Sequence, residues 1–323
     1  MAHTRLYRDG KLELEDFPVS DISEHVQDPE ATVWLDYCEP TQQDLQTIAS
    51  ELSLHPLAVE DAVNEHQRPK LDRYESHLFL NAYTVRLDTG TGELATSEIS
   101  VFITPRALVT VRKDEGVPID SILQRWDESA DLAGHGVAFL LWGVLDDIVD
   151  GHFEAVQSLD TEIEELQDAL FDTAAREVEV QRRSFELRKS LVLLRRVVLP
   201  MREVINSVMR RDLRVIDPEM TPYYQDVYDH VLRATDWTES LRDLVTTILE
   251  TNLAIQGNRM NLVMKKVTSW AAIIAVPTAI TGFYGQNVPY PGFAAHWGFW
   301  FSSAVIVVGS VTLYLAFKSR DWL

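Results

Sequence analysis

Hydrophobic residues are concentrated at the C-terminal end of the chain. Residues 267–317 contain no Asp, Glu, Lys or Arg, although the rest of the chain is strongly charged. This segment divides into two apolar stretches, residues 267–283 and 297–317, which flank a Pro/Gly-rich loop at residues 284–296. A bilayer core about 30 Å thick is crossed by roughly 20 helical residues. The pattern therefore predicts a transmembrane hairpin, whose first, slightly short helix must be extended at one of its ends.

Long helices are predicted in the middle of the chain. Residues 138–173 are nearly free of helix breakers and are acidic in their second half, whereas residues 177–213 carry nine Lys and Arg side chains. Two long helices joined by a short turn pack antiparallel. We therefore expect a helix pair within residues 136–216 whose opposite charges partly neutralise each other, ended by Asp217-Pro218.

A third long helix is predicted to lead into the membrane. It starts near Thr221-Pro222, where Pro suits the first helical turn. Its apolar residues recur three, four and seven positions apart, as a helical stripe requires, and they include Leu241, Leu244, Ile248 and Ile255. We expect a stalk at residues 217–266 that continues into the first span, giving one helix of about 60 residues and about 90 Å.

The first 135 residues show the mixed pattern of an α/β domain. Predicted strands, rich in β-forming residues, cover residues 31–37, 77–87, 98–104 and 107–112, and the last two form a hairpin around Pro105-Arg106. Predicted helices cover residues 41–52, with Thr41 as the N-cap, and residues 56–64. The expected fold is an α+β cytoplasmic domain with a mixed sheet, followed by a long stalk helix and a two-helix transmembrane hairpin.

The charge and the cysteine content of the chain exclude several classes of function. The chain has 50 acidic and 29 basic residues and a net charge of -21, which repels nucleic-acid phosphate and attracts cations. A single cysteine, Cys38, excludes a disulfide framework and a cysteine metal cluster. There is no nucleotide-binding loop, no Ser/His/Asp or Cys/His set, and no paired metal spacing among the nine His. We therefore expect no enzyme, no nucleotide and no organic cofactor.

The basic residues predict the orientation in the membrane. Lys265 and Lys266 precede the first span, Lys318 and Arg320 follow the second, and the loop between the spans has no Lys or Arg. Positive residues mark the cytoplasmic side, and the polar start of the chain lacks the apolar core of a signal peptide. Both termini, including the tail at residues 318–323, are expected in the cytoplasm, and the loop at residues 284–296 outside.

Several motifs, in order along the chain, resemble the CorA family of divalent cation channels. The turn Tyr284-Gly285-Gln286-Asn287 resembles the family signature, which usually reads Tyr-Gly-Met-Asn. The other matching residues lie at the family's spacing over about 300 residues: His55-Pro56-Leu57, Glu60-Asp61, His66-Gln67-Arg68-Pro69-Lys70, Pro222-Tyr223, Asp226-Val227-Tyr228-Asp229-His230, Asn258, Asn261, Met264, Lys265, Thr268, Pro277, Thr278, Gly282 and Trp322-Leu323.

The resemblance implies a funnel-shaped homopentamer in the plasma (inner) membrane, with the first spans around an axial pore and the second spans as an outer ring. It implies transport of hydrated divalent cations, Mg²⁺ first and also Co²⁺ and Ni²⁺. A divalent ion gains about 4.6 kcal/mol per 100 mV of membrane potential, so uptake needs no other energy source.

The resemblance assigns the signature turn to a selectivity filter. Mg²⁺ gives up its water reluctantly, and a ring of five Asn287 amides, with backbone carbonyls near Gly285, can accept hydrogen bonds from its water shell. Glycine at Gly285 permits φ > 0 and a close approach of chains, and Tyr284 is expected to pack and hold the turn. Gln286 replaces the usual Met, and the loop lacks the acidic residue that many relatives carry. Both departures leave the choice of ion open.

The resemblance also implies a pore lining and a gate. The family's pore-facing positions fall on Thr278, Ala275, Ala271, Val267, Met264 and Asn261. Rings of Met264 and Val267 would form a constriction that closes by dewetting. From sequence alone, these Met and Val side chains could equally contact lipid or other helices.

Gating is expected to depend on cytoplasmic Mg²⁺ as a regulatory ion. The resemblance places Asp61 of one subunit opposite Glu250 of its neighbour, where the family usually has Asp, with Glu60 and Asp226 as a second carboxylate set. Bound Mg²⁺ would lock the subunits and close the pore, and its loss would leave carboxylates that repel each other. Without the resemblance, these four residues could form a solvated acidic face.

Two alternatives stay open at this stage. One is a Zn²⁺ transporter of the same fold, because Gln286 departs from the usual signature. The other is a membrane-anchored oligomeric scaffold or sensor without transport, in which the hairpin is only an anchor.

Overall fold

The computed structural model describes residues 2–64, 67–170, 177–210, 213, 215–286, 288–290, 292–293 and 295–323. The chain forms two compact units, Met1–Ile248 and Leu249–Leu323. The boundary between them lies inside the predicted stalk. The finer divisions predicted at residues 135 and 216 stay predictions.

The first unit is built on a seven-stranded mixed sheet of order β2-β1-β3-β7-β6-β5-β4. Among the strands that the structure describes, β3 and β7 pair in parallel and the other neighbours are antiparallel. The strands are β1 (Ala2–Arg8), β2 (Lys11–Glu15), β3 (Ala31–Cys38), β4 (Lys70–Arg73), β5 (Leu78–Asp88), β6 (Glu93–Ile103) and β7 (Ala107–Arg112). The predicted mixed sheet and its hairpin around Pro105-Arg106 are confirmed.

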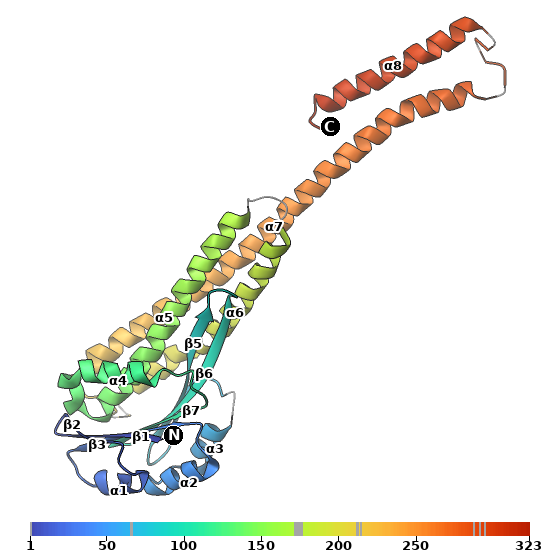
Figure 1. The fold of residues 1–323 in the computed structure, drawn as a ribbon. Helices are drawn as coiled ribbons and strands as arrows, with labels where there is room; N and C mark the ends of the chain where they lie inside the picture. The colour runs from blue at the N-terminus through green and yellow to red at the C-terminus, as the bar shows by residue number, and fades with distance from the viewer. Residues whose placement is uncertain are drawn as a thin grey trace. The chain divides into compact units, whose positions relative to one another are not determined.

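Helices cover both faces of the sheet. On one face lie α1 (Ile22–His25), α2 (Gln42–Glu51) and α3 (Pro56–Val63), and on the other lie α4 (Ile119–Glu128) and α5 (Val137–Leu170) (Figure 1). Strand residues alternate between the two cores: Val33 and Leu35 join the α1–α3 side, whereas Trp34 joins the α4–α5 side. This alternation follows from the period of two in a strand.

Short local signals place the helices of the first face. Thr41 caps α2 as predicted, since its side chain accepts a hydrogen bond from the amide of Asp44 while Asp44 accepts one from the amide of Thr41. His55 caps α3, whose first residue is Pro56. The His55 cap fixes where α3 starts, and so where this helix presents the carboxylates Glu60 and Asp61.

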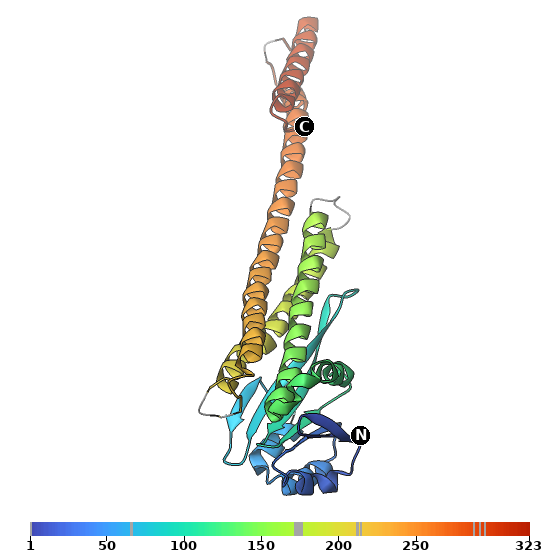
Figure 2. The ribbon, with the colours of Figure 1, turned by 90° about the vertical axis from the view of Figure 1, so that its left-hand side faces the viewer.

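The predicted pair of long helices is present. Figure 2 shows α5 lying along the sheet, with α6 (Glu177–Val208) beside it; residues 171–176 between them are outside the described part of the chain. Arg183 of α6 pairs with Glu162 of α5, so the acidic and basic helices neutralise each other in part. Arg195 of α6 instead reaches Glu239, with 2.7 Å between nitrogen and oxygen.

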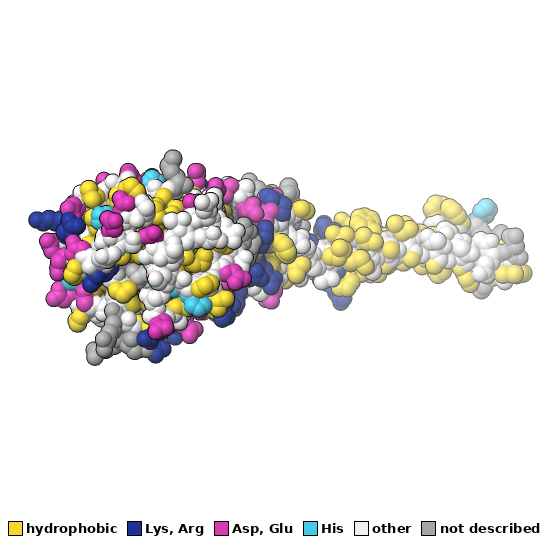
Figure 3. Space-filling view, turned by 90° about the horizontal axis from the view of Figure 1, so that it is seen from below, with side chains coloured by type: hydrophobic (Ala, Val, Ile, Leu, Met, Phe, Trp, Pro, Cys, Tyr) yellow, Lys and Arg dark blue, Asp and Glu magenta, His cyan; other side chains and the backbone are white. Residues whose placement is uncertain are grey.

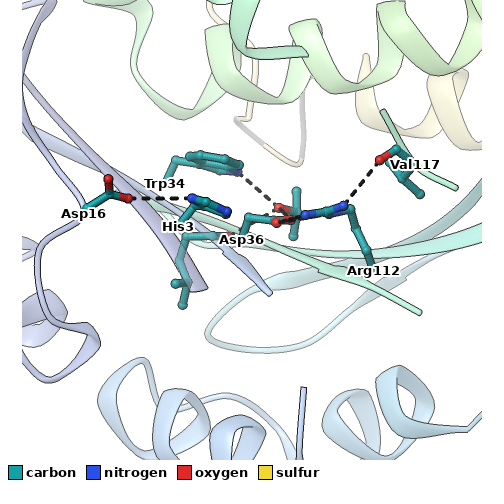
Figure 4. A network of polar contacts seen from close by, with 8 residues as sticks. His3, Asp16, Trp34, Asp36, Arg112 and Val117 are labelled. Carbon is teal, nitrogen blue, oxygen red and sulfur yellow. Dashed lines mark hydrogen bonds and ion pairs between the residues drawn. The ribbon is translucent and has the colours of Figure 1, made fainter. Parts of the chain in front are cut away.

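A closed polar network joins the parallel strands at the centre of the sheet (Figure 4). Asp36 is fully buried, and its Oδ2 lies 2.6 Å from Nη2 of Arg112. Thr110 donates to Oδ1 of Asp36 at 2.7 Å, and Arg112 donates to the carbonyl of Val117 at 3.3 Å. Because the two charges satisfy each other inside the fold, this network is structural; breaking such a pair typically costs about 3–5 kcal/mol.

The second unit contains an antiparallel helical hairpin. Helix α7 (Thr221–Tyr284) is one helix of 64 residues that begins in the first unit. Its C-terminal part forms the hairpin with α8 (His296–Lys318), which runs back beside its end (Figure 1). Both contain stretches long and apolar enough to cross a membrane. A Cβ added to Gly309 would lie 3.2 Å from Cγ1 of Val276, so the helices meet closely there.

The apolar side chains of this hairpin face outwards. Val267 and Val307 are each 60% exposed, and Trp300 is 71% exposed. Figure 3 shows hydrophobic side chains gathered over this segment, whereas acidic and basic side chains are spread over the visible face of the first unit. Contiguous apolar surface of this extent requires a membrane or another chain to cover it.

Candidate ion pathway and regulatory carboxylates

The signature turn lies at the C-terminal end of α7. The amide of Gly285 donates to the carbonyl of Thr281 at 2.8 Å, and Tyr290 donates from its hydroxyl to the carbonyl of Tyr284 at 2.9 Å. The ring of Tyr284 packs edge-on against Tyr290, with 5.0 Å between centroids. Gln286 is exposed, and Asn287 lies outside the described residues.

The backbone distinguishes between the two reasons for a glycine at position 285. Gly285 does not adopt positive φ. A Cβ on this residue would instead lie 3.0 Å from the carbonyl oxygen of Thr281, which is a tight contact. The glycine is therefore explained by the close approach of the helix's own backbone at its end, not by a left-handed conformation.

The end of α7 places a partial negative charge beside the turn. The carbonyls at the C-terminus of a helix carry a partial negative charge of about half an electron. Because α7 ends at Tyr284, this dipole lies next to Gly285 and Gln286. The turn thus offers a cation partial charges and oxygen dipoles, which suit a hydrated ion better than a dehydrated one.

The six predicted pore positions form one exposed stripe along α7. Asn261, Met264, Val267, Ala271, Ala275 and Thr278 follow each other at steps of three or four residues, and all are exposed. On the opposite face of the helix, Ser269 is fully buried and Val276 lies against Gly309 of α8. The hairpin therefore leaves this stripe uncovered within the chain.

Chemistry along the stripe is uncharged. Thr278 donates its hydroxyl hydrogen to the carbonyl of Ile274 at 2.9 Å, so only the oxygen lone pairs remain to face outwards. Met264 is 57% exposed. Next to it, Lys265 lies 6.0 Å from the ring of Trp322, so the closing Trp-Leu motif folds back onto α7.

The predicted regulatory carboxylates come from three places. Asp61 and Glu60 are neighbours on α3, Asp226 is exposed near the start of α7, and Glu250 is exposed further along α7, in the second unit. Among the residues that the structure describes, no three His, Cys, Asp or Glu side chains form a group that could hold a metal.

Asp61 already has a cationic partner. Nζ of Lys70, on β4, lies 2.6 Å from Oδ2 of Asp61 and 2.7 Å from Oδ2 of Asp72. Burial alone lowers the pKa of Lys70, but the hydrogen bonds to Asp61 and Asp72 outweigh it and raise the pKa. The sequence analysis treated Lys70 only as part of a motif. Its pairing with Asp61 depends on β4 lying beside α3, which a periodic pattern cannot show.

A second acidic group lies on α5, close to Asp226. Asp146 pairs with Arg125, and the same guanidinium lies 2.9 Å from Asp150. Burial raises the pKa of Asp146 to about 6; Arg125 opposes this, and the charges of Asp150 and Asp226 add to it. One arginine thus neutralises several carboxylates of this region, which the sequence analysis did not single out.

The fold and the exposed apolar hairpin define a membrane protein with a large mixed α/β domain and a two-helix anchor. The family model described as CorA-like Mg2+ transporter protein matches residues 29–319. The chain therefore belongs to this family, as the motifs predicted.

Three relatives illustrate the match. The cobalt/magnesium transport protein CorA of Thermotoga maritima is 30% identical over 316 residues, which cover 96% of this chain and 90% of the relative. The zinc transport protein ZntB of Pectobacterium carotovorum is 23% identical, over 85% of this chain and 83% of the relative. The complete structure of the CorA magnesium transporter from Methanocaldococcus jannaschii shares the fold, with a TM-score of 0.80, 22% identity and coverage of 100% and 99%.

Proposed function

We propose that the protein is a homopentameric channel of the plasma (inner) membrane that admits hydrated Mg²⁺ to the cytoplasm, driven by the membrane potential, and that also carries Co²⁺ and Ni²⁺. The observation that carries this proposal is the uncharged stripe on α7, exposed opposite the face that packs on α8. Two helices of one chain cannot enclose water in a bilayer. Several copies that bring their stripes together would form a conduit lined by amide, hydroxyl and apolar groups.

The outer mouth of this conduit would be formed by Gly285, Gln286 and Asn287. The dipole at the end of α7 and the Asn287 amides would hold the ion through its water shell, with Tyr284 fixed against Tyr290 behind them. Met264 and Val267 would form the gate. Its closure would follow Mg²⁺ binding between subunits at Asp61 and Glu250, with Glu60 and Asp226 contributing to a second site.

Ion flux into proteoliposomes tests the transport function. We expect a potential-driven Mg²⁺ flux in the wild type that falls by at least ten-fold in Asn287→Ala. Gln286→Met, which restores the usual family turn, serves as the matched control and should retain the flux. An unchanged flux in Asn287→Ala, or none in the wild type, would favour the membrane-anchored scaffold.

The Zn²⁺ alternative is tested in the same vesicles. It is favoured by Gln286 and by the similarity to a zinc transport protein. Parallel measurements with Mg²⁺, Co²⁺, Ni²⁺ and Zn²⁺ separate the two functions, because a zinc transporter should carry Zn²⁺ in a large excess of Mg²⁺. Flux of Zn²⁺ that Mg²⁺ does not reduce would overturn Mg²⁺ as the main substrate.

A further inference from the structure

Lys70 forms an ion pair with Asp61, the carboxylate at which the regulatory ion is proposed to bind. Its ammonium is shared between Asp61 of α3 and Asp72 of its own strand, at 2.6 and 2.7 Å. The side chain of Lys70 is 23% exposed and that of Asp61 is 26% exposed. Both are therefore partly shielded from water, where an ion pair is stronger than on an open surface.

The position of Lys70 is fixed by more than the two carboxylates. Its ammonium lies 5.8 Å from the centroid of the Phe79 ring, within the range of a cation–π contact. The side chains of Lys70 and Asp61 keep 23% and 26% of their surface exposed, so water and small ions can reach this ion pair.

A divalent ion and Lys70 cannot both use Asp61 fully. A carboxylate that donates electron density to an ammonium is a poorer metal ligand, and the two cations repel each other. Asp72 changes the balance, because Lys70 can leave Asp61 and keep a carboxylate partner 2.7 Å away. Displacement of Lys70 by an ion therefore leaves no unpaired buried charge.

We propose that Lys70 is a tethered competitor of the regulatory divalent ion at Asp61, and that Asp72 is the alternative partner which accepts Lys70 when the ion binds. This inference rests on the proposed regulatory role of Asp61. Lys70 then sets the Mg²⁺ concentration at which the site fills, because the ion must displace one positive charge that the fold supplies. The pair acts as a regulatory element and does not contact the transported ion.

Two substitutions should move the affinity in opposite directions. Lys70→Met keeps the stem over Phe79 and removes the charge, so Mg²⁺ should bind about ten-fold more tightly, as expected for one unit charge about 6 Å from a divalent ion in water-like surroundings. Asp72→Asn leaves Lys70 with Asp61 alone, so binding should weaken by roughly three-fold. A loss of folding would weaken binding in both variants.

The experiment measures the MgCl₂ concentration that gives half-maximal protection of the full-length protein from proteolysis in detergent. Lys189→Met is the matched control: it removes the same charge from an exposed pair with Glu93, 3.5 Å apart and 70% exposed on both sides. It should leave the midpoint unchanged. Thermal unfolding in EDTA checks that each variant is folded.

The outcomes separate this inference from the function on which it rests. If Mg²⁺ protects the wild type and Asp61→Ala weakens the protection, but Lys70→Met and Asp72→Asn keep the wild-type midpoint, the competition is refuted and the regulatory site stands. If Mg²⁺ does not protect the wild type, or Asp61→Ala is unaffected, the regulatory site itself is refuted. Opposite shifts in the two variants support the competition.

Discussion

At the scale of single residues, His152 of α5 is a neutral histidine held inside the fold. It is fully buried, and its Nε2 donates to the carbonyl of Tyr83 on β5 at 2.7 Å. Its Nδ1 has no hydrogen-bond partner among the residues that the structure describes. Burial lowers the pKa of His152 to about 4, although the hydrogen bond to Tyr83 acts in the opposite direction.

This histidine should make the protein sensitive to acid. The unfolded chain binds a proton at His152 near pH 6.5, whereas the folded chain resists it down to about pH 4. Its contribution to stability is thus complete above pH 6.5 and is lost as the pH falls towards 4. In His152→Gln, which keeps a donor, the loss of unfolding free energy between pH 7.5 and pH 5 should be about 2 kcal/mol smaller than in the wild type.

Chemical unfolding of the full-length protein in detergent at the two pH values measures this difference. Equal pH dependence in His152→Gln and the wild type would contradict the assignment.

At the scale of elements, two glycines of α5 have opposite roles. Gly143 allows Trp126 of α4 to lie against the helix, and a Cβ there would lie 2.2 Å from Nε1 of Trp126. That nitrogen donates to the carbonyl of Leu140 at 3.2 Å. Gly151, eight residues further along the helix, has no atom within 4 Å of an added Cβ.

Alanine at these two positions should therefore change stability with opposite sign. Gly143→Ala should lower the unfolding free energy by about 1–3 kcal/mol, because it overpacks the core and displaces Trp126. Gly151→Ala should raise it by up to about 1 kcal/mol, because alanine favours the helix. Denaturation monitored by tryptophan fluorescence compares the variants, and a stabilised Gly143→Ala would show that α4 does not pack as described.

The elements that the sequence predicted are those with a strong local pattern. The long helices, the apolar hairpin and the strands β3, β5, β6 and β7 were anticipated, since each is periodic or rich in β-formers. The strands β1, β2 and β4 were not. Their charged residues hide the alternation, as at Arg5, which is 8% exposed and paired with Glu15 and Asp127. Such strands are specified by distant partners, which no local pattern contains.

The candidate site was predictable to the same extent. The exposed stripe on α7 follows from helical spacing once the family's pore positions are assigned. The conformation of Gly285 was left open, because glycine serves both positive φ and close packing and the sequence does not distinguish them. The link between Lys70 and Asp61 depends on how β4 lies beside α3, so it could only come from the fold.

At the scale of the whole molecule, the proposed pore depends on which apolar side chains face an axis and which face lipid. Val267 on α7 and Val307 on α8 have the same side chain and the same exposed fraction, 60%. The proposal assigns Val267 to the gate and Val307 to the outer ring. Substitution of each valine in turn therefore distinguishes an assembly with a central pore from a helix bundle without one.

Serine at Val267 should weaken the closed state of the channel. A smaller, polar ring raises the tendency of water to enter a constriction, so Val267→Ser should show several-fold more Mg²⁺ flux than the wild type at a Mg²⁺ concentration that closes the wild type. Val307→Ser should keep the wild-type flux in the same vesicles. Equal fluxes in all three proteins would argue against an axial gate at Val267.

The ammonium shared by Asp61 and Asp72 has a consequence for how the assembly would rest without its ion. When Mg²⁺ leaves Asp61, the carboxylate still has a positive partner, because Nζ of Lys70 lies 2.6 Å from its Oδ2. Departure of Mg²⁺ would then loosen the ring mainly by removing a bond between neighbours and only weakly by mutual repulsion. Subunits in the open state would then be loosely held and not pushed apart by charge. The Mg²⁺ concentration at which the pore opens would be determined by Lys70.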